Sequence, residues 1–213
     1  MKHITFTFDV ISPYAYLAFE KLPEVLKGLS YSVEYRPVLF AAFLKHHGQL
    51  GPAEIPPKRD WTYRQVLWLA HANGIPMQMP AAHPFNPLGL LRLGLACGDS
   101  GRVNRHVAEA LFHHVWRGGA EATDPVRLAA LQARLQPVRD PAGDDVKAEL
   151  KSNTETAIAR GLFGVPACEV DGKIFWGFDG LAMLRAYVDG DAFFTSGAWE
   201  QAAAVPAGQA RRG

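Results

Sequence analysis

The sequence ITFTFDVISPYAYLA, residues 4–18, contains a strand pattern followed directly by a helix start. Apolar residues and threonine alternate over residues 4–10, which is typical of a short buried strand. Ser12 and Pro13 then predict the beginning of a helix, because serine caps free backbone amides and proline suits the first helical position. Helix-forming residues continue over residues 14–27. This stretch therefore predicts a strand that passes into a helix at Ser12.

Strand patterns return on both sides of a long central region. Residues 31–38 alternate again, so the first part of the chain predicts a βαβ unit with two parallel strands. Near the other end, residues 167–170 and 173–176 flank Asp171-Gly172, which is a strong hairpin signal. A last helix is predicted over residues 179–188.

The region between these strands carries only helix signals. A loop rich in glycine and proline, residues 48–60, comes first. Helices are predicted over residues 61–73, 86–100, 103–116, 125–135 and 144–160, the last with a break near Ser152 left open. The order of elements is that of an α/β, thioredoxin-like fold interrupted by an inserted all-helical domain.

This order predicts a discontinuous domain organisation. The thioredoxin-like domain is expected over residues 1–40 and 155–200, and the inserted helical domain over residues 41–154. Residues 201–213 are expected to be a flexible tail, with fraying from about Gly197, because the residues there are small and polar.

The composition excludes several classes of protein. The chain has 213 residues, 48% of them hydrophobic, and 22 Lys plus Arg against 21 Asp plus Glu, which gives a net charge of +1. Such a chain can bury a core, and its charge balance predicts no nucleic-acid or membrane partner. It has no run of 18 apolar residues, and its first residues do not resemble a signal peptide. We therefore expect a cytoplasmic protein.

Cysteine and histidine give no metal or redox motif. Cys97 and Cys168 lie far apart and form no Cys-x-x-Cys pair, which argues against a zinc ribbon, a disulfide scaffold and a dithiol motif. Cys168 is expected to be a small buried hydrophobe. Neighbouring histidines on a helix do not share a face, so no metal ligand set is predicted from the two adjacent pairs, His46-His47 and His113-His114.

Three positions are candidates for chemistry. Ser12 begins a helix, where free amides and the helix dipole stabilise an anion such as a thiolate; the plain alternative is an N-cap only. Val165 precedes Pro166, which is commonly cis in this fold, and its backbone could pair with a peptide-like ligand; the alternative is an ordinary loop proline. Asp179 is expected to cap the last helix and could also bind the ammonium of an α-amino-acid group.

Four segments, taken in order, make a resemblance specific. They are FTFDVISPYAYLA (6–18), GPAEIPPKR (51–59), HPFNPL (83–88) and GLFGVPACEVDGKIFWGFDGL (161–181). Together they resemble the 2-hydroxychromene-2-carboxylate isomerase family, which is related to the kappa-class glutathione transferases in the DsbA-type branch of the thioredoxin superfamily. The resemblance spans residues 6–188 and implies a homodimer.

The resemblance places the chemistry at Ser12. Disulfide oxidoreductases of this branch carry Cys-x-x-Cys where this chain has Ser12 and Ala15, and a serine cannot exchange disulfides. In the resembled family this serine is catalytic and donates a hydrogen bond to the sulfur of bound glutathione. The thiol pKa of that glutathione is then expected below the free value of about 8.5.

The resemblance also implies residues for both ligands. The residues expected to bind glutathione, besides Ser12, are Pro13, Tyr14, Gln49, Val165, Asp179 and Gly180. The residues expected to bind a second, anionic aromatic substrate are Lys58, Arg59, Phe85 and Asn86. Plain alternatives remain for the last group, since Lys58 and Arg59 could be solvated and Asn86 could cap a helix that begins at Pro87.

The activity implied is a glutathione-dependent cis–trans isomerisation. It would convert 2-hydroxychromene-2-carboxylate to trans-o-hydroxybenzylidenepyruvate in the degradation of aromatic hydrocarbons, by addition and departure of the glutathione thiolate without a metal. Two alternatives are a kappa-class-like transferase or peroxidase, and a glutathione- or peptide-binding module without catalysis.

Overall fold

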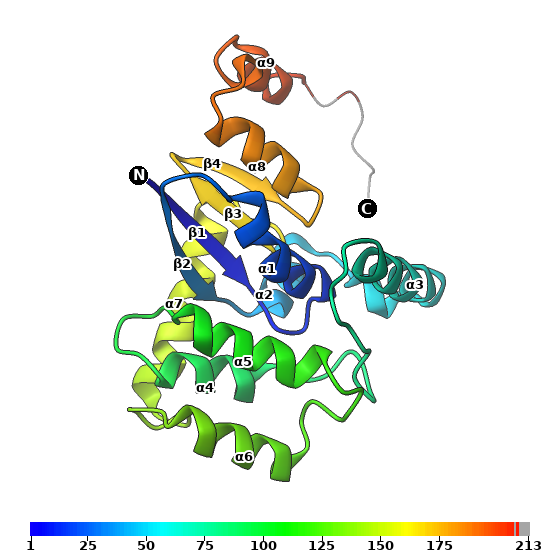
Figure 1. Cartoon of the computed structure of the whole chain (residues 1–213), viewed down its shortest axis with the longest axis vertical. Helices are drawn as coiled ribbons and strands as arrows, with labels where there is room; N and C mark the ends of the chain where they lie inside the picture. The colour runs from blue at the N-terminus through cyan, green and yellow to red at the C-terminus, as the bar shows by residue number, and fades with distance from the viewer. Residues whose placement is uncertain (207, 209–213) are drawn as a thin grey trace.

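A four-stranded mixed sheet lies at the centre of the fold (Figure 1). The computed structural model describes residues 1–206 and 208. The strands, in the sheet order β2-β1-β3-β4, are β2 (Tyr31–Pro37), β1 (Lys2–Phe8), β3 (Ala167–Val170) and β4 (Lys173–Trp176). β1 pairs parallel with β2 and antiparallel with β3, and β3 pairs antiparallel with β4. The predicted βαβ unit and hairpin are both confirmed.

The helices occupy the predicted places around this sheet, with two additions. They are α1 (Pro13–Val25), α2 (Phe40–His47), α3 (Pro56–Ala72), α4 (Leu88–Ala96), α5 (Arg105–Trp116), α6 (Pro125–Leu135), α7 (Asp144–Ala159), α8 (Gly180–Val188) and α9 (Ala198–Ala203). Short 3-10 turns lie at Pro52–Glu54 and Ala192–Phe194. In the described chain, the regular elements between β2 and β3 are all helical, as the thioredoxin-like fold with a helical insertion requires.

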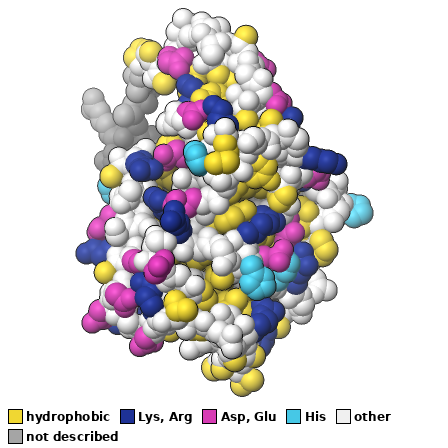
Figure 2. All heavy atoms as spheres, turned by 60° about the vertical axis from the view of Figure 1, so that its left-hand side comes forward, with side chains coloured by type: hydrophobic (Ala, Val, Ile, Leu, Met, Phe, Trp, Pro, Cys, Tyr) yellow, Lys and Arg dark blue, Asp and Glu magenta, His cyan; other side chains and the backbone are white. Residues whose placement is uncertain are grey.

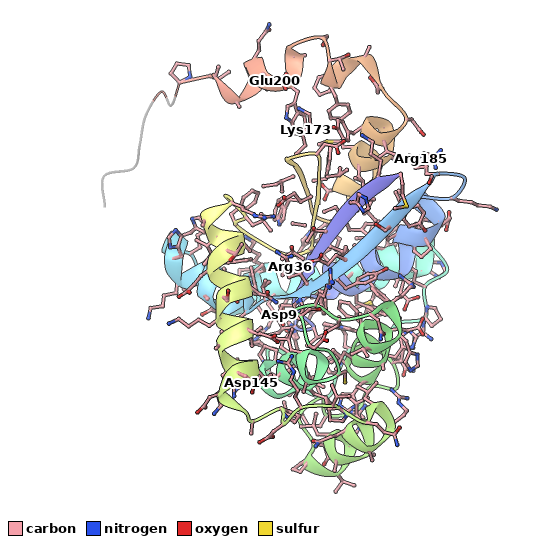
Figure 3. All side chains as sticks on the ribbon, turned by 90° about the vertical axis from the view of Figure 1, so that its left-hand side faces the viewer. Asp9, Arg36, Asp145, Lys173, Arg185 and Glu200 are labelled. Carbon is pink, nitrogen blue, oxygen red and sulfur yellow. The ribbon has the colours of Figure 1, made fainter. Side chains whose placement is uncertain are left out.

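The helices cover the sheet on two faces and at one end. α1 and α7 lie on opposite faces of the sheet (Figures 1 and 3). α4, α5 and α6 stack below the end of the sheet at which β1 finishes (Figure 1). The end of β1 and the start of α1 therefore lie between the sheet and the inserted helices.

Several helix boundaries in the insertion differ from the predictions. α3 begins at Pro56 rather than at residue 61, because proline is compatible with the first turn of a helix. α4 is shorter than predicted, and α7 runs unbroken through Ser152. α7 also crosses residues 154–155, the predicted domain boundary.

α2 is a helix that the sequence did not predict. Its first amide, Phe40 N, donates to the Asp9 carboxylate at 2.9 Å, and Gly48 ends it in a left-handed conformation with φ of 62°. The group that satisfies the start of this helix therefore comes from a residue far away in the sequence.

The prediction of fraying from Gly197 onward is wrong for α9. Lys173 of the hairpin donates a 2.9 Å hydrogen bond to the carboxylate of Glu200 on α9, and the two form an ion pair (Figure 3). The Trp199 ring lies 5.2 Å from that of Phe194. These contacts hold the helix against the hairpin. The rest of the predicted tail includes residues 207 and 209–213, which lie outside the described residues.

One hydrophobic core joins the sheet to the insertion. The Phe8 ring of β1 lies 5.1 Å from that of Phe112 on α5, and Phe112 also lies 5.0 Å from Phe19 on α1. Trp116, fully buried, stacks 6.3 Å from Tyr16. Because α5 shares this core with β1 and α1, the insertion is fixed rigidly against the start of α1.

The surface agrees with the near-neutral composition. Figure 2 shows basic and acidic side chains interspersed over the face it presents, rather than gathered by sign. Among the described residues, no helix has the length and hydropathy needed to cross a bilayer.

Candidate functional site

Ser12 joins the start of α1 to the loop before β3. It is the N-cap of α1, and its Oγ accepts a hydrogen bond from Ala15 N at 3.2 Å. The same hydroxyl donates to the carbonyl oxygen of Val165 at 3.4 Å, and it is only 7% exposed. The Val165–Pro166 peptide bond is cis. The predictions that Ser12 is an N-cap and that the Val165–Pro166 bond is cis are both confirmed. Ser12 and Val165 are in direct contact.

A buried carboxylate lies beneath this serine. Asp9 is fully buried, and its two oxygens accept from Ile11 N at 3.0 Å and from Phe40 N at 2.9 Å. Its backbone carbonyl also accepts from Ser12 N at 3.1 Å. Burial raises the pKa of Asp9 to about 7, although the two amide hydrogen bonds act in the opposite direction. Figure 3 shows Asp9 between the end of the sheet and the inserted helices.

The insertion holds the same loop through two ring nitrogens. Trp116 Nε1 donates to the carbonyl oxygen of Val10 at 2.9 Å, and His83 Nε2 lies 2.8 Å from that of Ile11. Since a carbonyl oxygen only accepts, His83 Nε2 carries the hydrogen. Both carbonyls of the turn before Ser12 are therefore fixed by the insertion, one from α5 and one from the loop between α3 and α4.

His83 is uncharged at neutral pH, and its ring is held by Tyr63 and Trp116. Its Nδ1 lies 2.8 Å from the Tyr63 hydroxyl, and its ring lies 5.6 Å from that of Trp116. Burial lowers the pKa of His83. His83 lies in the HPFNPL segment and was not among the predicted site residues. No local pattern could have paired it with Ile11, because the contact is long-range.

Tyr14 and Asp179 form the second part of the site. The Tyr14 hydroxyl donates to Gln65 Oε1 at 2.6 Å. Burial raises the pKa of Tyr14, and the nearby Asp179 carboxylate raises it further, so the hydroxyl keeps its proton at neutral pH. Tyr14 therefore bonds α1 to α3 and lies near enough to Asp179, at the start of α8, to feel its charge.

The prediction that the Asp179 side chain caps α8 is wrong. Asp179 takes the N-cap position, but its backbone is helical and its side chain accepts no capping hydrogen bond. A Cβ on Gly177, which has φ of 89°, would lie 2.4 Å from Asp179 Oδ1, so the carboxylate folds back over this glycine. A side chain at Gly180 would press on the backbone of Phe175 at 3.2 Å. Gly180 can therefore offer a ligand only its amide.

Two exposed aromatic rings border the Val165 loop. The rings of Phe163 and Trp176 lie 4.9 Å apart, and Trp176 is 50% exposed. A Cβ on Gly164 would lie 2.6 Å from Trp176 Nε1, so glycine is required for this packing. The loop that contacts Ser12 thus has an exposed aromatic surface beside it. Phe163 and Trp176 were not among the predicted site residues.

The predicted second-substrate residues lie on α3 and on the loop before α4. Lys58 and Arg59 are in the first turn of α3, where Lys58 is exposed and Arg59 pairs with Asp60 at 3.5 Å. Burial raises the pKa of Tyr63, and the nearby charge of Arg59 acts in the opposite direction. Arg59 therefore lies near Tyr63, which contacts His83.

The remaining predicted ligand residues are Phe85, Asn86 and Gln49. Phe85 is half-buried with its ring 6.0 Å from that of His83. Asn86 is exposed, and its Oδ1 accepts from Leu88 N at 3.1 Å. Because α4 begins at Leu88 with Pro87 in the N-cap position, the alternative that Asn86 is the N-cap of a helix beginning at Pro87 is wrong. Gln49 is exposed beyond the end of α2. None of these three residues bonds to Ser12 among the described residues.

The described residues contain no group of three His, Cys, Asp or Glu side chains placed to hold a metal ion. Both cysteines are free thiols. Cys168 is buried, as predicted, and burial raises its pKa to about 12. Its thiol is therefore protonated at neutral pH and is no nucleophile.

Comparison with known proteins places this geometry in a family. The DSBA-like thioredoxin domain profile matches residues 3–189. 2-Hydroxychromene-2-carboxylate isomerase from Sphingobium xenophagum is 30% identical over 197 residues, covering 88% of this chain and 98% of the relative. Glutathione S-transferase kappa 2 from Caenorhabditis elegans is 28% identical, with 78% and 79% covered.

A solved structure agrees with the fold. The structure of a 2-hydroxychromene-2-carboxylate isomerase superposes with a TM-score of 0.77 at 22% identity, covering 91% of this chain and 98% of the other. The chain therefore belongs to the DSBA-like thioredoxin-domain family, in the group that contains 2-hydroxychromene-2-carboxylate isomerases and kappa-class glutathione transferases.

Proposed function

We propose that the chain is a glutathione-dependent cis–trans isomerase of an aromatic carboxylate, with 2-hydroxychromene-2-carboxylate as its substrate. The observation that supports this most is the Ser12 hydroxyl, which lies at the N-cap of α1 and contacts Val165. Position 15 is alanine rather than cysteine. A site with this geometry and no thiol of its own suits a thiol that arrives with a ligand.

The residues present fit glutathione. The Val165 carbonyl accepts only the long bond from Ser12 among the described hydrogen bonds, so it remains available to an extended peptide. The uncapped start of α8 provides amides for a carboxylate, and Asp179 provides an anion for an ammonium group. When bound, glutathione supplies a thiolate that adds to the conjugated substrate, permits rotation about a single bond and leaves.

The chain's own groups perform binding, orientation and charge stabilisation. Ser12, whose hydroxyl donates to Val165 at 3.4 Å, would donate instead to the sulfur in a charge-assisted bond, and the start of α1 would favour the anionic form. Lys58 and Arg59 bind the substrate carboxylate. Phe85 and Asn86 contact its ring and its hydroxyl.

The assay that tests this function uses purified protein with and without glutathione. A chromene carboxylate should be isomerised only when glutathione is present, and a generic aryl halide should react much more slowly. The reverse preference would replace the proposal with a kappa-class transferase. A rise in melting temperature with glutathione but no turnover would indicate a binding module. Homodimerisation and a cytoplasmic location, which the resemblance implies, stay predictions.

His83 should matter for turnover through the position of Ser12. His83→Ala removes the donor to the Ile11 carbonyl and should lower kcat/KM about 10-fold, since a displaced catalytic group loses rate steeply. His83→Gln keeps an N–H near the Nε2 position and should recover most of the loss. Measuring kcat/KM of the wild type and of both variants at several pH values would check this. Equal losses in both variants would mean that His83 only fills space.

A further inference from the structure

A groove of about 500 Å³ lies between α2, α4 and α7. α2 separates it from the Val165 loop, because Phe43 packs on one side with Val165, whereas Ala42 and His46 line the groove on the other. Its volume is in the range that holds a small organic molecule. The groove is therefore a candidate site independent of Ser12.

The groove is lined by apolar and by ionisable residues, which we call its floor and its rim. The apolar residues on its floor are Leu39, Leu88, Leu150 and Ile158, of which Leu150 is buried. The ionisable residues on its rim are Lys45, His46, Arg92, Lys147, Lys151 and Glu155. Glutamate is thus the single acid among the lining residues, and this asymmetry favours an anion with an apolar body.

Two of the four lysine and arginine side chains on the rim have surface partners. Lys147 pairs with Asp144 at 2.9 Å, and Lys151 lies 3.7 Å from Glu155. These ions are exposed, and such pairs stabilise a protein little, so a ligand anion can compete for the lysines. Lys45 and Arg92 form no ion pair among the described residues.

Arg92 is the group that most needs a partner. It is half-buried, and its Nε is buried without any hydrogen-bond acceptor in the described structure. A buried, unsatisfied N–H of a charged group is costly, and an anionic ligand would give the guanidinium acceptors in a planar, paired geometry. Arg92 therefore marks the place of the anionic group in the groove.

We propose that the groove between α2, α4 and α7 is a second ligand site, which binds small amphipathic organic anions such as aromatic carboxylates or sulfonates. The apolar floor packs against the body of the ligand, Arg92 binds its anionic group, and the rim lysines add attraction. A ligand can occupy this site while glutathione is bound at Ser12.

The test is a fluorescence titration of the full chain with anilinonaphthalene sulfonate, in the presence of saturating S-hexylglutathione. The probe should bind in the groove and should not be displaced by S-hexylglutathione. Its uncharged analogue phenylnaphthylamine, which has the same rings, should bind about 10-fold more weakly, because one charge-assisted interaction corresponds to about 1.4 kcal/mol.

Three variants assign the probe to the groove. Arg92→Met should weaken probe binding about 10-fold, and Lys151→Glu, an exposed change that keeps the fold, should weaken it in the same direction. Arg134→Met on the exposed face of α6 is the matched control and should leave binding unchanged. Melting temperatures measured alongside would show that each variant is folded.

Two results would overturn the second site. One is unchanged probe affinity in both groove variants. The other is displacement of the probe by S-hexylglutathione, which would place the probe at Ser12. If S-hexylglutathione itself does not bind, the proposed function fails, while the comparison of Arg92→Met with the control still tests the groove.

Discussion

Ser12→Ala is expected to lower kcat/KM for glutathione-dependent turnover by at least about 10-fold. A hydrogen bond to a charged acceptor contributes about 1.5 to 3 kcal/mol, and Ser12 is proposed to make such a bond to the sulfur. The pKa of the bound thiol should rise toward about 8.5 in the variant. Ultraviolet titration of thiolate formation would measure this shift together with the kinetics.

A matched control separates this chemistry from helix capping. Ser12→Ala also removes the cap on Ala15 N, a loss of about 1 kcal/mol in stability. Asn104→Ala removes an equivalent cap on Val107 N at the start of α5, where the bond is 2.9 Å. Asn104→Ala should therefore lower the melting temperature without changing the thiol pKa. If Ser12→Ala keeps full activity, Ser12 takes no part in the mechanism.

Asp9 should make stability depend on pH in an unusual direction. Its pKa is about 7 in the folded protein and 3.8 without burial. Between about pH 4 and about pH 7 the unfolded chain has released a proton that the folded protein retains, so this residue lowers stability as pH rises. A shift of this size corresponds to roughly 4 kcal/mol, and the dependence vanishes below and above this range.

The comparison with Asp9→Asn isolates this residue. Asparagine does not ionise, and other titrating groups contribute equally to both proteins. The free energy of unfolding of the wild type, minus that of Asp9→Asn, should fall by roughly 4 kcal/mol between about pH 4 and about pH 7. Denaturant unfolding at a series of pH values would measure it. A difference that is constant with pH would mean that Asp9 is ionised throughout.

The sequence predicts those parts of the fold whose signals are local. The strand before Ser12, the cap at Ser12 and the turn at Asp171-Gly172 each depend on residues a few positions apart, and each is present. α2 depends on Asp9, and α9 depends on Lys173. Both helices escaped prediction because their stabilising partners are distant in the chain.

The candidate site shows the same limit. The contact between Ser12 and Val165 joins positions 153 residues apart. The predicted thioredoxin-like fold and the family resemblance brought the two together, and no local pattern did. His83 and Trp116 bind the backbone of the Ser12 turn from the insertion, and neither was a candidate. Ring nitrogens that bond to distant carbonyls leave no periodic signal in a sequence.

A crystal structure with bound glutathione would decide whether Ser12 holds the reacting sulfur. We expect the sulfur within about 3.5 Å of Ser12 Oγ, at hydrogen-bonding distance, with the cysteinyl backbone paired to Val165. A sulfur more than about 4 Å from that oxygen, or glutathione bound elsewhere, would contradict the assignment of Ser12.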